Sequence, residues 1–109
     1  INALASRLYK GMEEVIRRRG VKAVIQGVGA RFGFYCGLEE TPIYDYRKMV
    51  HSFDSAMNHR FVKKAFEKQL YWHDYGSKFS PTHHGFTSAH TSQDIDETIE
   101  RCDDILKSM

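Results

Sequence analysis

The feature that most constrains the fold is a pair of strand-like runs joined by a short glycine-containing connection. Residues 22–28 are rich in β-branched side chains. In residues 31–36, every second residue is a phenylalanine or a cysteine, and the residues between them are an arginine, a glycine and a tyrosine. Two such runs separated by Gly29 and Ala30 predict antiparallel strands joined by a turn. Successive side chains of a strand face opposite ways. One face of the second strand should therefore carry Phe32, Phe34 and Cys36, and the other Arg31, Gly33 and Tyr35.

Three longer segments repeat apolar residues at helical spacing, which predicts amphipathic helices. The first covers residues 2–19 and ends at Gly20; Gly11 should weaken it by about 1 kcal/mol relative to alanine. The second runs from about Asn58 to Trp72, with Gly76 marking its exit. The inward residues of this second helix should be Phe61, Val62, Ala65, Phe66 and Leu70.

The last helix should begin at Thr91 or Ser92, where Thr91 and Asp94 have the spacing of a capping box. Its apolar stripe consists of Ile95, Ile99, Cys102, Ile105 and Leu106. Before it, a turn containing Pro81 leads into an extended segment at 83–89. A short helix capped by Asp45 should carry Met49, Val50 and Phe53.

The order of these elements is helix, strand, strand, one or two helices, strand, helix. It predicts an α+β fold in which helices pack on a small, mostly antiparallel sheet. With 109 residues, the chain should form a single domain over residues 1–109. It begins on a helical pattern at Ile1 without an initiator methionine, and we interpret it as a piece of a longer polypeptide.

The charge balance and the cysteines favour a reducing, cytoplasmic-type location. Sixteen basic and fourteen acidic residues nearly cancel, and the basic run at 17–19 stands where it complements the end of a helix dipole. We therefore expect neither nucleic acid nor membrane as a partner. Cys36 and Cys102 fall in a predicted strand and a predicted helix, which is typical of buried thiols rather than of a disulfide framework.

The histidines raise the possibility of a metal site, since His73, the His83–His84 pair and His90 all lie in the second half of the chain. Adjacent strand residues face opposite ways, so His83 and His84 are poorly placed to share a metal. A metal-binding module is therefore the weaker alternative. Cys36 is placed for burial rather than nucleophilic attack, and Gly27-x-Gly29 precedes no helix, unlike a dinucleotide loop. The chain shows no complete active site of its own.

Two runs in the second half carry a resemblance to a known family. They are residues 61–70 and, after Gly76 and Pro81, Gly85-Phe86-Thr87-Ser88-Ala89-His90-Thr91 continuing to Asp96. The pattern resembles the C-terminal small domain of class III pyridoxal-phosphate aminotransferases, within them the glutamate-1-semialdehyde aminomutase branch. Residues 27–35 and 41–43 resemble the strands and loop that open this domain. The likeness is specific at 61–99 and looser before residue 58.

The resemblance implies a domain of a fold-type I enzyme that works as a homodimer. The small domain would pack on a large domain of the same enzyme, help to close the active site, and help to bind an amino-acid or amine substrate. Pyridoxal phosphate would be held as a Schiff base by a lysine of that large domain, and the 109-residue segment alone would be inactive. No catalytic or cofactor-binding role falls on this chain's own lysines, which are Lys10, Lys22, Lys48, Lys63, Lys64, Lys68, Lys78 and Lys107.

His83 and His84 are the substrate-region candidates that the resemblance indicates. In the aminomutase branch an acidic residue stands two places before the Gly-Phe pair, where this chain has His83; the ornithine-type branch has an arginine near this place. A histidine there could contact a substrate carboxylate, and the substitution favours an aminotransferase over the aminomutase reaction. Two alternatives stay open. In the first, His83 and His84 are plain strand residues at a surface; in the second, the chain is a freestanding α+β ligand-binding or regulatory module.

Overall fold

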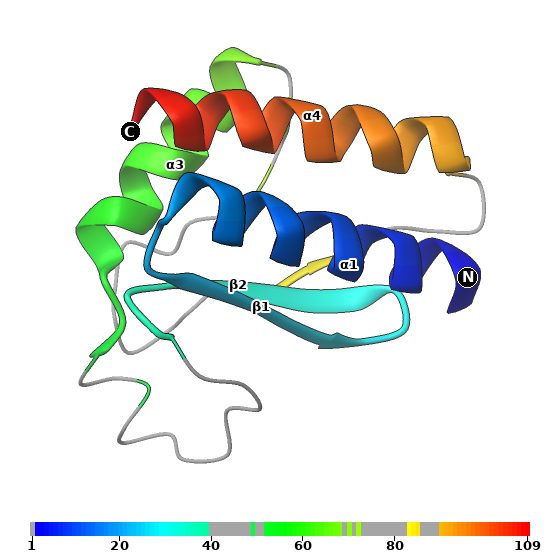
Figure 1. Ribbon diagram of the computed structural model, residues 1–109, viewed down its shortest axis with the longest axis horizontal. Coiled ribbons are helices and arrows are strands. Elements are labelled where there is room, and N and C mark those ends of the chain that lie inside the picture. Colours follow the sequence, from blue (N-terminus) through cyan, green and yellow to red (C-terminus); the bar gives the residue numbers. More distant parts are fainter. Residues whose placement is uncertain are drawn as a thin grey trace.

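The computed structural model describes residues 2–39, 49, 52–68, 70, 72, 83–85 and 90–109, with the backbone alone for Asn2 and His83. Three strands form one antiparallel sheet in the order β1–β2–β3. Among the described residues, three long helices lie against it (Figure 1). The elements are α1 (Asn2–Arg19), β1 (Ala23–Val28), β2 (Arg31–Cys36), α3 (Ser55–Glu67), β3 (His83–Gly85) and α4 (Ser92–Ser108). The predicted α+β class is confirmed.

The predicted hairpin is confirmed. Ile25 of β1 pairs with Phe34 of β2, and the register continues to the pair Val28 and Arg31 at the turn. Gly29 in this turn has a φ of 57°, a left-handed conformation that glycine adopts without a steric cost. The phenolic oxygen of Tyr9 on α1 donates a hydrogen bond to the carbonyl oxygen of Gly29 at 2.6 Å. This bond ties the turn to the helix above it.

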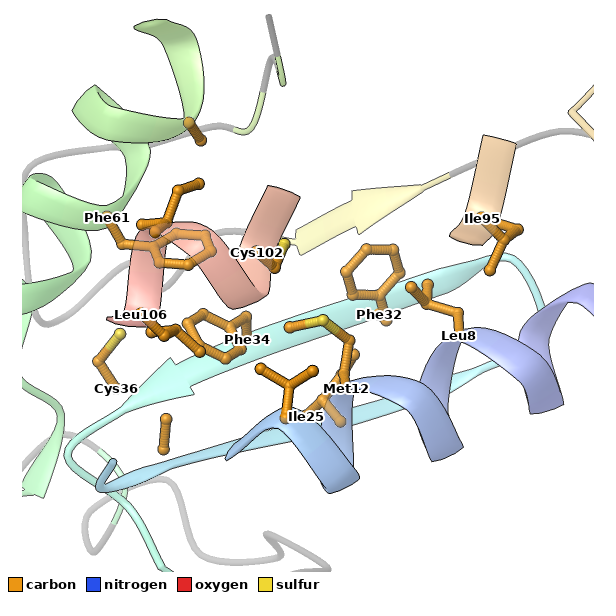
Figure 2. Packing of buried hydrophobic residues seen from close by; sticks show 14 residues of the cluster. Leu8, Met12, Ile25, Phe32, Phe34, Cys36, Phe61, Ile95, Cys102 and Leu106 are labelled. Atoms are coloured by element: carbon orange, nitrogen blue, oxygen red, sulfur yellow. The ribbon is translucent and has the colours of Figure 1, made fainter. Parts of the chain in front are cut away.

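Helices α1 and α4 lie side by side over one face of the sheet (Figure 1). The core between helices and sheet is built from the apolar residues that helical spacing and strand alternation predict to face inward. They include Leu8 and Met12 of α1, Phe32 and Phe34 of β2, and Cys102 of α4 (Figure 2). Phe61 of α3 packs on Phe34, with 4.8 Å between the ring centroids. All three helices therefore share one apolar core on the Phe32 and Phe34 face of the sheet.

A second, smaller cluster lies on the opposite face of the hairpin. It consists of Val24, Tyr35, Leu38, Met49 and Phe53. The chain folds back at Gly37, whose φ is 93°, and the backbone N–H of Asp54 donates to the carbonyl oxygen of Cys36 at 2.8 Å. Strand alternation predicts Tyr35 on this face, but not that it is buried there.

Three details of the second predicted helix, expected from about Asn58 to Trp72, are wrong. It begins at Ser55 because the side chain of Asp54 accepts a hydrogen bond from the N–H of Met57 at 2.9 Å, and it ends at Glu67 rather than near Trp72. Phe66 was expected to face inward, yet it is 66% exposed. At 100° per residue, Phe66 lies roughly 140° around the helix from the buried Phe61, outside the stripe that faces the core.

Some expectations lie outside the described residues. They are the cap at Asp45, Val50, the exit at Gly76, the turn at Pro81 and the extension of the last strand over residues 86–89. Met49 and Phe53 of the predicted short helix are described, and both are buried.

Candidate functional site

The candidate site is built around β3, the strand that contains His83 and His84. Its three residues pair with β2 in an antiparallel register: His83 with Gly33, His84 with Phe32, and Gly85 with Arg31. Among the described strands, β3 pairs with β2 alone and so lies at one edge of the sheet. The two predicted substrate-region residues therefore lie next to the middle of β2.

His84 lies on the helix-covered face of the sheet. It is 6% exposed, and its ring lies 4.6 Å from that of Trp72 and 5.5 Å from that of Phe32, between centroids. These contacts make His84 part of the aromatic core in this structure. His83 is placed by its backbone in β3, opposite Gly33.

The face of β2 turned away from the three helices carries Arg31, Gly33 and Tyr35. Tyr35 is 8% exposed, and burial raises the pKa of its phenol. A methyl group added at Gly33 would lie 2.6 Å from both Cζ and the phenolic oxygen of Tyr35. The Tyr35 ring is therefore folded back along its own strand, and its hydroxyl lies over Gly33, the residue that pairs with His83.

The two thiols are buried in the main core and free. Burial raises the pKa of the Cys36 thiol to about 12, and the nearby carboxylate of Asp54 adds to the effect. Burial also raises the pKa of Cys102. Because the thiolate is the reactive form, neither cysteine is set up as a nucleophile.

Within the part of the chain that the structure describes, no three His, Cys, Asp or Glu side chains are close enough to hold a metal ion. His59 and His90 are exposed on the surface, and His73 lies outside the described residues. A hollow of about 340 Å³ runs between α1 and α4 and is lined by Arg18, Asp96, Ile99, Glu100 and Asp103. Arg18 and Asp103 form an ion pair at 2.9 Å inside it, and with Asp96 and Glu100 the lining carries three carboxylates against one guanidinium.

Comparison with known proteins relates the chain to aminotransferases. No protein-family model matches the sequence. The chain is 27% identical over 106 residues to glutamate-1-semialdehyde 2,1-aminomutase from two strains of Desulfitobacterium hafniense, DCB-2 and Y51. That alignment covers 95% of this chain and 23% of each relative.

The fold is that of part of an omega-transaminase from Sphaerobacter thermophilus. The match has a TM-score of 0.79 at 19% identity, and it covers 98% of this chain and 23% of that one. The resemblance to the C-terminal small domain of class III aminotransferases is confirmed.

The chain spans about a quarter of the length of the relatives it matches. Among the described helices, none is sufficiently long and apolar to cross a membrane. Six lysines lie among the described residues. Lys10, Lys22, Lys63, Lys68 and Lys107 are exposed. Lys64 is half-buried and donates a hydrogen bond to the hydroxyl of Ser108 at 3.1 Å.

Strand alternation placed Arg31, Gly33 and Tyr35 on one face of β2, but it did not predict that Tyr35 would be buried there. The available signal was Gly33 between them, since a glycine inside a strand often marks the close approach of another group. That the group would be the ring of Tyr35 follows from a side-chain conformation, which strand periodicity does not fix.

Proposed function

We propose that residues 1–109 form the C-terminal small domain of a larger pyridoxal-phosphate enzyme. This enzyme would be an aminotransferase or aminomutase that acts on an amino-acid or amine substrate. The observation that carries the proposal is the agreement of two comparisons: aminomutase similarity over 95% of the chain, and the fold of an omega-transaminase domain over 98% of it. Both relatives extend well beyond the matched part.

In this proposal the cofactor is held by the rest of the polypeptide, because five of the six described lysines are exposed and the sixth, Lys64, is hydrogen-bonded to Ser108. The natural partner of the domain is the large domain of the same enzyme, and the parent works as a cytoplasmic homodimer. The domain's own contribution is to pack against the large domain and to supply contacts at the substrate. His83 is the first candidate for such a contact, since His84 is taken up by packing against Trp72 and Phe32.

The test compares the 109-residue chain with the full-length polypeptide that contains it. Each protein is incubated with pyridoxal phosphate, reduced with borohydride and digested, and cofactor-modified lysines are quantified by mass spectrometry. We expect one stoichiometric adduct in the full-length protein, on a lysine outside residues 1–109, and none in the short chain. A stoichiometric adduct on a lysine within residues 1–109 would contradict the assignment of the cofactor. A full-length protein that forms no adduct would contradict the proposed function.

A further inference from the structure

The hairpin of β1 and β2 carries almost no charge, in contrast to the helices. Arg31 is the only charged residue in residues 23–36, whereas α1, α3 and α4 each carry at least four charged residues. When one face of an antiparallel sheet is in water, that face is usually polar. The composition of the hairpin is therefore that of a sheet in which both faces are covered.

The domain itself covers only part of the face that is turned away from the helices. Val24 of β1 and Tyr35 of β2 are buried there in the second, smaller cluster. Val28 lies on the same face of β1 as Val24, because side chains alternate along a strand, and it is 88% exposed. The apolar row of β1 thus continues to the tip of the hairpin, beyond the residues that cover its beginning.

The tip is held in place by α1. The hydroxyl of Tyr9 lies 2.6 Å from the carbonyl oxygen of Gly29 and 3.3 Å from that of Arg31, so it contacts the turn and the start of β2. The residues on either side of Val28 are Gly27 and Gly29, which have no side chains to shield it. Since a valine has few rotamers and its turn is already fixed, little conformational freedom is lost when Val28 packs against another surface.

Phe66 of α3 is also exposed, at 66%, but its surroundings are different. Lys63, one helical turn before it, and Glu67, directly after it, are both exposed. Single apolar side chains among charges are common on water-facing surfaces, while lysine and glutamate are depleted at the centres of interfaces. The hairpin turn and α3 lie at opposite ends of the sheet (Figure 1). Phe66 is therefore a matched control for Val28.

The large domain of the parent enzyme is the occupant that the comparisons favour. The chain covers 23% of each aminomutase relative and 23% of the omega-transaminase chain, so most of such a polypeptide lies outside this domain. Apolar side chains that are exposed on one domain mark the surface where another domain packs. A cover for Val28 is thus available within a polypeptide of that length.

We propose that the tip of the β1–β2 hairpin is a docking point for the large domain of the parent enzyme, with the side chain of Val28 seated in an apolar pocket of that domain. This inference rests on the proposed function, because the large domain belongs to the full-length polypeptide. The charged outer faces of the helices, including that of Phe66, face water in the same enzyme.

The test measures the accessibility of both positions in the full-length protein. Val28→Cys and Phe66→Cys are each treated with a thiol reagent at pH 8, and the labelled peptides are quantified by mass spectrometry. We expect the thiol at position 66 to react as fast as a free thiol. The thiol at position 28 should react at least about 100-fold more slowly, because the contact with the large domain has to open first. Equal rates at the two positions would overturn the docking point.

A crosslink identifies what covers the tip. With a photoreactive benzoylphenylalanine at position 28 of the full-length protein, we expect one defined crosslink to a peptide outside residues 1–109. A crosslink to residues 1–109 of a second copy, or no crosslink, would contradict the large domain as the occupant. These outcomes are read in a protein that has formed its cofactor adduct. Absence of that adduct would instead overturn the proposed function.

Discussion

Gly11 shows how one residue can stabilise packing at the expense of its own helix. An ideal Cβ at this position would collide with Cδ1 of Ile99 on the facing helix α4. Glycine costs an α-helix about 1 kcal/mol relative to alanine. Because glycine has no side chain, α1 and α4 can approach each other with the side chain of Ile99 between them.

A double-mutant cycle with Ile99 can measure how the helix-propensity cost of Gly11 compares with the packing that it allows. Ile99→Val removes the colliding methyl group and alone should cost about 1 kcal/mol. We expect Gly11→Ala to change the free energy of unfolding little in the original protein, and to stabilise the Ile99→Val background by about 1 kcal/mol. Urea denaturation of the four proteins gives the coupling. The same effect of Gly11→Ala in both backgrounds would show that Ile99 does not set the spacing.

At the scale of single elements, α4 depends on a defined start. The hydroxyl of Thr91 accepts a hydrogen bond from the N–H of Asp94 at 3.2 Å, and the Asp94 carboxylate accepts one from the N–H of Thr91 at 2.8 Å. We expect Thr91→Ala to lower the free energy of unfolding by about 1 kcal/mol. Ser92→Ala, one position inside the helix, is the control and should have less than half that effect in the same denaturation experiment. Equal losses would mean that the cap is not what stabilises α4.

The ion pairs between α1 and α4 predict how stability depends on pH. Asp103 accepts hydrogen bonds from Nε of Arg19 at 2.6 Å and from Arg18 at 2.9 Å. These contacts, Arg19 first, hold the pKa of Asp103 below its usual range. The folded protein thus binds this proton less readily than the unfolded chain does. The stabilisation is complete above the unfolded pKa of about 3.9, and it is lost as pH falls through the folded value.

We therefore expect the free energy of unfolding to decline as pH drops below about 5, and to decline less steeply in Asp103→Asn. Asp94 and Asp96 also have lowered pKa values, so part of the acid dependence should remain. Asp104→Asn is the control, because Asp104 has no hydrogen-bonded partner among the described residues. Thermal unfolding from pH 2 to 7 checks this; identical slopes for Asp103→Asn and the unsubstituted protein would rule out the contribution.

For the whole molecule, sequence periodicity predicted the packing of helices on the sheet better than it predicted the surroundings of the candidate site at β3. The hairpin, α1 and the capped α4 follow from local spacing, because each buries one apolar face and has its own turn or cap residues. The exposure of Phe66 and the length of α3 could not be predicted from local spacing. They depend on where Asp54 caps the helix and on which helix face packs against Phe34. The burial of His84 beside Trp72 likewise depends on contacts between distant segments.

Cys36 and Cys102 allow the cooperativity of the whole domain to be tested. Cys36 ends β2 and Cys102 lies in α4, yet both are fully buried in the same core. Burial raises the pKa of Cys36 to about 12 and also raises that of Cys102. Since only the thiolate reacts quickly, a thiol reagent at pH 8 should modify either residue only after the core opens.

If the core opens as one unit, both thiols should report the same free energy of opening, equal to that of global unfolding. We expect Cys36→Ala and Cys102→Ala, each with one remaining thiol, to be labelled at rates that match once corrected for their measured stabilities. Faster labelling of Cys36 under native conditions would show instead that the end of β2 opens locally.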